Sequence, residues 1–212
     1  MNIAVIGSNG FISKNLIVKL RFSNNKIFKI NRSTSKKKLE KILLESDIIY
    51  HLAGVNRPKV SQNFENENVG LTKKICNFLL KKTFKKEKTI IFSSSTQIFK
   101  KSSYGISKKK CEKLLINLKK KNKINVVILR LPNIFGKWCK PNYNSVVSTF
   151  CYNISRKKKV NLFNEHSKIN LLYIDDLIDL LIKYLKIKVK KFKIINKFKF
   201  SHNITVKKFF YF

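Results

Sequence analysis

Short apolar runs alternate with amphipathic segments along most of the chain. The runs are rich in isoleucine, valine and phenylalanine, which is typical of buried β-strands, and they lie at residues 2–6, 26–30, 47–54, 89–95 and 125–131. Between them, apolar residues recur every three or four positions, as on the buried face of a helix. Helices are predicted from Phe11 to Leu20 and at residues 36–45, 72–82, 104–118 and 145–155.

This alternation predicts an α/β fold, a doubly wound parallel sheet of the Rossmann type with helices on both faces. We find no internal repeat and no linker, and 212 residues suit a single domain. Open parallel sheets bind ligands at the carboxyl ends of their strands. The site is therefore expected in the segments that follow strands, at residues 7–13, 31–33, 52–58, 93–98 and 132–144.

The formal charge of +36 changes this picture little. Only five of the 47 basic residues are arginine, whereas specific nucleic-acid surfaces rely on arginine for forked contacts with bases and phosphates. The lysines cluster where the predicted helices end, and the helix dipole favours cations there. We expect a solvated basic surface with non-specific affinity for polyanions and no specific nucleic-acid partner. A nucleic-acid binder stays open as an alternative, which the salt dependence of binding would separate.

Targeting and metal-binding signals are absent from the sequence pattern. No segment reaches the roughly 18 uncharged residues that a membrane span needs, and no basic lead precedes the first apolar run, as a signal peptide requires. The four cysteines form no CxxC pair, and the three histidines lack the spacing of metal ligands. We expect a reduced, cytoplasmic protein with no bound metal and no membrane partner.

A glycine-containing turn, GSNGFIS at residues 7–13, separates the first strand from the first helix. The first glycine can make the sharp exit from the strand, and the second lets a pyrophosphate approach the free N–H groups of the helix start. The expected cofactor-binding residues here are Gly7, Asn9, Gly10, Phe11 and Ile12. Ser13 stands where such a loop usually has a third glycine, which weakens the pattern without abolishing it.

The end of the second strand predicts which cofactor binds. It reads INRST, without the acidic residue that binds the ribose 2′-hydroxyl of NAD. Arg32 in this segment can instead bind the 2′-phosphate of NADP through charge-assisted hydrogen bonds. We therefore predict NADP(H) as the cofactor; the alternative is that Arg32 is one more basic surface residue.

The segment YGISK places Tyr104 and Lys108 four residues apart at a helix start, so that both side chains share one face. An ammonium beside a phenol is expected to lower the tyrosine pKa, which lets the tyrosine donate and accept protons near neutral pH. The preceding strand ends in FSSS, residues 92–95, whose hydroxyls could hold a substrate carbonyl.

The chain carries a nucleotide-binding loop, then a serine run, then YxxxK. In this order of motifs it resembles the extended short-chain dehydrogenase/reductase family. The resemblance implies a catalytic triad of Ser95, Tyr104 and Lys108, of which the last two also contact the cofactor. It also sets the segment HLAG beside the cofactor, adding Leu52, Ala53 and Gly54 to the binding residues. The departures are Ser13 and the lack of a proline before the tyrosine; neither removes a catalytic atom.

Two blocks resemble the CapF-type capsular polysaccharide enzymes more narrowly: HLAGVNRP at 51–58 and RLPNIFGKWCKPNYNSVVSTFCYNI at 130–154. The resemblance implies an NADPH-dependent reductase, and we expect it to be a homodimer. It would reduce the 4-keto group of a UDP-2-acetamido-2,6-dideoxy hexulose on the route to UDP-N-acetyl-L-fucosamine. The loops expected to wall the UDP-sugar pocket carry Arg57, Asn133, Trp138 and Asn144. For Trp138 the alternative is core packing. For Asp175 and Asp176 we expect a structural position, as the N-cap and a first-turn acid of a helix.

Two further functions stay open at this point. A nucleotide-sugar epimerase or dehydratase of the same fold is one, although dehydratases place acidic residues after the active hydroxyl, where this chain has Thr96 and Gln97. A non-catalytic NADP-binding protein is the other.

The last residues predict a helix that Thr205 caps, with Val206, Phe209 and Phe210 on its inner face. The chain then ends in FFYF, and such apolar surface is normally covered. We therefore expect residues 1–212 to form a reductase domain that is truncated at its C-terminus, without the metal-binding cupin domain of the CapF-type enzymes.

Overall fold

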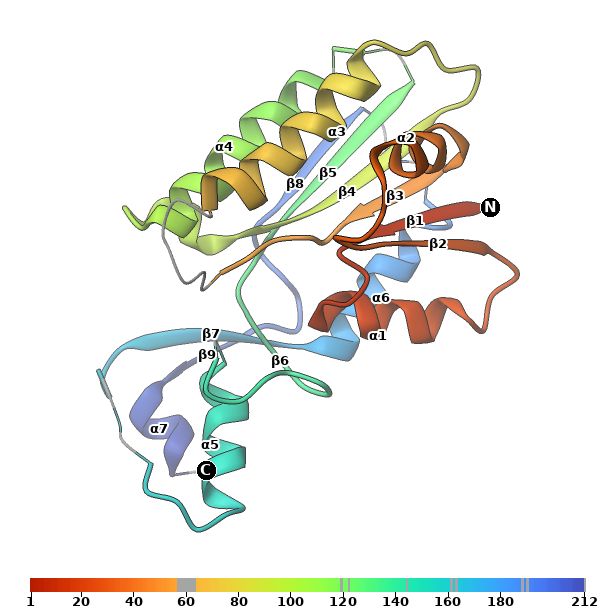
Figure 1. Ribbon diagram of the computed structural model, residues 1–212. Coiled ribbons are helices and arrows are strands. Elements are labelled where there is room, and N and C mark those ends of the chain that lie inside the picture. Colours follow the sequence, from red (N-terminus) through yellow and green to blue (C-terminus); the bar gives the residue numbers. More distant parts are fainter. Residues whose placement is uncertain are drawn as a thin grey trace.

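The computed structural model describes residues 1–56, 64–118, 120–121, 123–143, 145–160, 162, 164–187, 189 and 191–211. Its main sheet has six parallel strands in the order β2-β1-β3-β4-β5-β8 (Figure 1). These strands are β1 (Asn2–Ile6), β2 (Lys26–Ile30), β3 (Ile48–His51), β4 (Lys88–Ser95), β5 (Ile124–Leu131) and β8 (Phe192–Ile195). The predicted doubly wound α/β fold is confirmed.

Helices cover both faces of this sheet (Figure 1). One face carries α1 (Phe11–Leu20) and α6 (Ile174–Lys183), and the other carries α2 (Lys36–Glu45), α3 (Leu71–Leu80) and α4 (Ser103–Leu118). Alternate strand residues point to opposite faces: Ile3 and Val5 pack with α1 and α6, whereas Ala4 and Ile6 pack with the other three helices. Burial on both faces explains why the strands read as continuous apolar runs.

A second, three-stranded sheet follows the carboxyl end of β5 (Figure 1). It contains β6 (Asn133–Phe135), β7 (Lys168–Tyr173) and β9 (His202–Thr205). The helix α7 (Val206–Phe210) contacts β9, and α5 (Val146–Ile154) packs against α7 through Phe150. The sequence analysis predicted a loop at 132–144 and did not predict this second sheet. That expectation is wrong because strands as short as β6 carry too few residues to display a period.

The C-terminal helix forms as predicted. The Thr205 hydroxyl accepts a hydrogen bond from the Lys208 amide at 3.2 Å, which caps α7. Val206 is buried, and the rings of Phe209 and Phe210 lie 5.9 and 5.7 Å from the ring of Phe150.

The paired acids at the start of α6 have a structural position. Asp175 and Asp176 lie in the first turn, where the positive end of the helix dipole stabilises a carboxylate. The residue at the N-cap is Tyr173, so the first-turn expectation is confirmed and the N-cap expectation is wrong.

Among the described residues, no helix is both long and apolar enough to cross a bilayer.

Ser13 gives a test of the packing under α1. Its hydroxyl is buried and has no hydrogen-bond partner among the described residues, and such a group costs about 1–3 kcal/mol. We expect Ser13→Ala to raise the free energy of unfolding by about 1 kcal/mol, seen as a higher urea midpoint with an unchanged slope.

Ser107→Ala is the matched control. Ser107 is equally buried in a helix, but its hydroxyl donates to the Tyr104 carbonyl at 2.8 Å and accepts from Asn68 at 3.2 Å. This variant should be less stable than the parent chain. A Ser13→Ala chain no more stable than the parent would contradict the assignment.

Candidate active site

The turn after β1 is shaped by close approach to the next strand. Gly7 has a φ of 84°, and a Cβ atom there would lie 2.6 Å from the Cα of Ala53. Its amide donates to the Ile30 carbonyl at 2.9 Å, and its own carbonyl accepts from the Gly10 amide at 2.9 Å. Gly10 then precedes α1 with no side-chain cap and no acid in the first turn. The helix start is therefore open to an anion, as a pyrophosphate-binding turn requires.

A cleft of about 1330 Å³ lies over this turn. It brings together most of the predicted cofactor residues, namely Gly7, Asn9, Gly10, Arg32, Leu52, Ala53 and Gly54. The other four predicted cofactor residues, Phe11, Ile12, Tyr104 and Lys108, are not part of its lining in the described residues. The side chains of Phe11 and Ile12 pack against the core on the α1 face of the sheet. Any contribution of these two residues to a cofactor site comes from their backbone N–H groups.

Arg32 lies on the wall of this cleft in an ion pair that the sequence did not predict. Its Nη2 atom donates to Oε2 of Glu67. The carboxylate comes from a π-helical segment, η1 (Phe64–Gly70), which also lines the cleft. The preceding residue, Asn31, folds the loop through its Oδ1 atom, which accepts from the amide and hydroxyl of Ser33 at 3.0 and 2.6 Å.

The three predicted catalytic residues lie together where β4 meets α4. Ser95 is the last residue of β4, Tyr104 lies in the first turn of α4, and Lys108 follows Tyr104 by about one helical turn. The ring of Tyr104 lies 5.9 Å from Nζ of Lys108. A Cβ atom on Gly105 would lie 2.1 Å from the Gln97 carbonyl oxygen, so only glycine lets the helix start this close to the strand end.

The pKa of Tyr104 differs from the expected one. Burial raises it to about 12, although the hydrogen bond with Ser95 lowers it. The expectation of a phenol that ionises near neutral pH is therefore wrong for this chain, because desolvation outweighs the stabilisation of the phenolate. Tyr104 keeps its proton throughout the neutral range.

Lys108 is buried beneath the site. Its ammonium donates to the Ser93 carbonyl at 2.8 Å and lies 4.7 Å from the centre of the Phe92 ring. Burial lowers its pKa to about 8, an effect that Cys111 and Glu112 partly offset. Burial and the nearby Lys108 charge also lower the pKa of His51 to about 3. His51 is therefore neutral, and Lys108 is the cation beside the cleft at Gly54, where a Cβ atom would lie 3.0 Å from Nζ.

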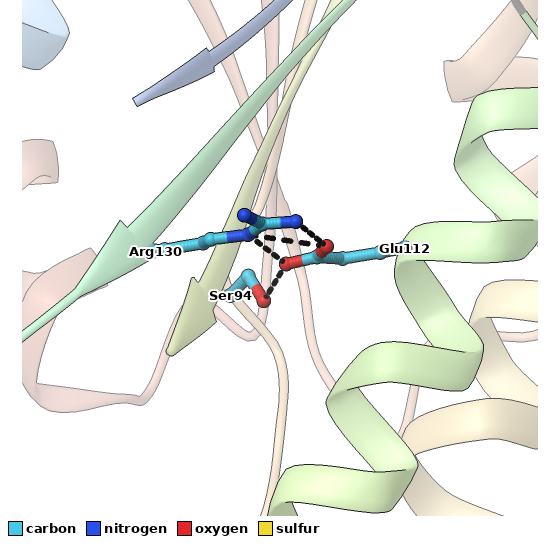
Figure 2. Close-up of polar contacts among 3 residues, drawn as sticks. All are labelled: Ser94, Glu112 and Arg130. Atoms are coloured by element: carbon cyan, nitrogen blue, oxygen red, sulfur yellow. Dashed lines mark hydrogen bonds and ion pairs between the residues drawn. The ribbon is translucent and has the colours of Figure 1, made fainter. Parts of the chain in front are cut away.

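A buried ion pair fixes α4 against the sheet (Figure 2). Glu112 lies one helical turn after Lys108, and its carboxylate accepts from Arg130 of β5 at 2.8 Å and from the Ser94 hydroxyl at 2.5 Å. Ser94 directly precedes Ser95 in β4. The network therefore joins the helix that carries Tyr104 to both strands beside it.

Asn68 ties the cleft to the same helix. Its Oδ1 accepts from the Val55 amide at 2.8 Å, and its Nδ2 donates to the Val55 carbonyl at 3.0 Å and to Ser107 at 3.2 Å. Sequence reasoning missed Asn68 and Glu67, because η1 has neither a helical nor a strand period. It also missed Glu112, although the spacing of four from Lys108 places both on one helix face.

The predicted sugar-binding residues are only partly described. Arg57 and Asn144 lie outside the described residues. Asn133 is exposed on β6 and donates to the Asn170 carbonyl at 3.2 Å. Trp138 has a φ of 67° and is half exposed, so it is not a buried core residue. The buried Asn15 of α1 donates to the Lys137 carbonyl at 3.0 Å, which holds the loop before Trp138 against α1.

Comparison with known proteins agrees with this geometry. Residues 3–196 match the model of the NAD dependent epimerase/dehydratase family. The chain belongs to this family. Over 179 residues it is 36% identical to a UDP-2-acetamido-2,6-beta-L-arabino-hexul-4-ose reductase of Pseudomonas aeruginosa, covering 84% of this chain and 48% of the relative. The chain thus spans about half the length of the curated relative that it matches.

Solved structures of the family superpose closely. The capsular polysaccharide assembling protein CapF from Staphylococcus aureus has a TM-score of 0.81 at 34% identity, covering 98% of this chain and 56% of that chain. The UDP-glucuronic acid 4-epimerase from Bacillus cereus, in complex with UDP-glucuronic acid and NAD, has a TM-score of 0.82 at 19% identity, covering 98% and 80%. The latter likeness concerns the fold alone. The resemblance to CapF-type enzymes is confirmed.

The buried ammonium predicts a pH-dependent stability. Lys108 has an ordinary pKa of 10.5 when the chain unfolds and about 8 in the fold. The unfolded chain therefore binds more protons between these values, and stability rises with pH across this window. We expect the free energy of unfolding of the parent chain to rise relative to that of Lys108→Met, by on the order of 3 kcal/mol between pH 7 and 10.5.

Chemical denaturation of both chains at several pH values checks this difference. The comparison cancels the contribution of the other lysines, because they are present in both chains. Parallel stability curves for the two chains would show that Lys108 is not desolvated.

Proposed function

We propose that the chain uses NADPH to reduce the 4-keto group of a UDP-2-acetamido-2,6-dideoxy hexulose, in the synthesis of UDP-N-acetyl-L-fucosamine for surface polysaccharide. The observation that carries the proposal is the grouping of Ser95 at the end of β4, Tyr104 in the first turn of α4 and the buried Lys108, whose Nζ atom reaches the cleft at Gly54. The 36% identity to a UDP-sugar 4-keto reductase supports the choice of substrate.

The cleft suits a nicotinamide dinucleotide. Gly7 and Gly10 would hold the pyrophosphate at the start of α1, with Asn9, Phe11 and Ile12 contributing from the same turn. Arg32 would bind the 2′-phosphate of NADP. Leu52, Ala53 and Gly54 would line the path toward Lys108, where the nicotinamide ribose belongs.

The catalytic residues then have distinct roles. The bound cofactor supplies the hydride that adds to the ketone carbon. Ser95 orients the ketone oxygen, and Tyr104 transfers its phenolic proton to the alkoxide that forms there. A phenol with a pKa of about 12 is protonated at neutral pH and is a stronger acid than the alcohol that forms when the alkoxide takes the proton, so the transfer is downhill. Lys108 keeps a positive charge beside the phenol as the proton leaves.

The sugar nucleotide would lie on the side of the second sheet. Asn133 and Trp138 are the described candidates for its binding, with Arg57 and Asn144 proposed beside them. We further propose a cytoplasmic homodimer that requires no nucleic acid.

Tyr104→Phe tests the chemistry. It deletes a proton donor and little volume, so we expect turnover of a UDP-4-keto sugar, followed by loss of NADPH absorbance, to fall by roughly a factor of 10²–10⁴. The dissociation constant for NADPH should change little. Tyr152→Phe, on the outer helix α5, is the matched control and should behave as the parent chain. If Tyr104→Phe keeps half of the parent rate, Tyr104 is not the acid.

Arg32→Ala tests the cofactor. We expect NADPH affinity to fall by about 1–2 kcal/mol, the low end for a charged hydrogen bond because the side chain is largely exposed. NADH affinity should change far less, since NADH lacks the 2′-phosphate. Titration calorimetry with both cofactors measures this. Lys36→Ala, which removes another cation from the cleft wall, separates a specific contact from general charge. Equal losses for NADPH and NADH would assign Arg32 to the fold alone.

A further inference from the structure

The residue proposed to select NADPH is already engaged by an acid. Arg32 comes from the loop after β2 and Glu67 from η1, segments 35 residues apart that meet on the cleft wall. The end of the second strand is where dinucleotide folds place the group that contacts the ribose 2′ position. The ion pair is therefore at the point of the cleft that distinguishes NADP from NAD.

The carboxylate of Glu67 disfavours the binding of a 2′-phosphate at Arg32. The Nη2 atom of Arg32 already donates to Glu67, so a 2′-phosphate that binds Arg32 must share this donor or displace the carboxylate. The carboxylate of Glu67 then lies close to a phosphate of the same charge, and like charges at this separation repel. A ribose 2′-hydroxyl carries no charge and meets no such repulsion.

The other charges on the cleft wall do not remove this conflict. Lys36, Lys74 and Lys81 also line the cleft and attract any dinucleotide. Among the described residues that line the cleft, Glu40 is the other acid; its Oε1 lies 4.0 Å from Nζ of Lys36. Its side chain has the same exposed fraction as that of Glu67, 34%. The two acids differ in whether they contact Arg32.

We infer that Glu67 is a specificity-determining residue that weakens the binding of NADPH relative to NADH by competing with the 2′-phosphate for Arg32. The inference rests on the proposed function, because it concerns the same cofactor site. It gives the chain a smaller preference for NADPH than Arg32 alone would produce, since specificity is a difference of two affinities.

The experiment measures the dissociation constants of NADPH and NADH for the full chain by titration calorimetry. Glu67→Gln keeps the shape of the side chain and removes its charge. We expect it to bind NADPH roughly fivefold more tightly, the size of an exposed charge interaction, and NADH within about twofold of the parent chain. The gain should shrink as salt is raised. Glu40→Gln makes the same change in net charge and should leave the NADPH constant within about twofold.

The Arg32→Ala background completes the test. The gain from Glu67→Gln should shrink there if it acts through Arg32, as a double-mutant cycle measures. The inference is wrong if Glu40→Gln gives an equal gain in NADPH affinity, or if the gain from Glu67→Gln persists without Arg32. In either case the proposed function still holds as long as the parent chain binds NADPH. Weaker NADH binding by Glu67→Gln also overturns it, because Glu67 would then be an acceptor for the ribose hydroxyl. A parent chain that binds neither cofactor overturns the proposed function together with the inference.

Discussion

The position of α4 on the sheet depends on the buried ion pair between Glu112 and Arg130. One face of this helix carries both Lys108 and Glu112 into the interior, and a buried charge without a partner costs several kcal/mol. The carboxylate is satisfied by Arg130 and Ser94, and the ammonium by the Ser93 carbonyl. All of these partners come from the ends of β4 and β5. The contacts that make the burial tolerable are therefore also the ones that set Tyr104 beside Ser95.

Close backbone packing completes the assembly. At Gly7 the turn after β1 approaches the backbone of Ala53, two residues after β3, and at Gly105 the start of α4 approaches the backbone of Gln97, two residues after β4. At Gly54 the neighbour is the Nζ atom of the Lys108 side chain. At each point a Cβ atom would lie 3.0 Å or less from its neighbour. Three segments that are distant in the sequence can meet around one cleft because glycine leaves room for them. Asn68 then bonds the loop at Val55 to α4 through Ser107.

Elements with a clear period could be predicted from the sequence, and contacts between distant segments could not. The apolar runs give β1 and β2 with their observed bounds, and the amphipathic pattern gives α2 from Lys36 to Glu45. The second sheet was missed because β6 and β9 are short and follow loops. The Ser95, Tyr104 and Lys108 set follows from motif order. The pairing of Arg32 with Glu67 could not be predicted, because no local pattern indicates which residue of η1 contacts the loop after β2. The tyrosine pKa depends on burial, which spacing alone does not reveal.

The pKa of Tyr104 also bears on the direction of the chemistry. An epimerase begins by taking a proton from a sugar hydroxyl, which requires an ionised tyrosine, whereas a ketone reductase begins with a proton to give. Burial that raises the pKa to about 12 favours the second role at neutral pH. A reduced nicotinamide is uncharged and leaves this balance in place, whereas the cationic oxidised ring that an epimerase uses would lower the tyrosine pKa. With the reduced cofactor that we propose, desolvation of the phenol therefore leaves Tyr104 with a proton to give at neutral pH.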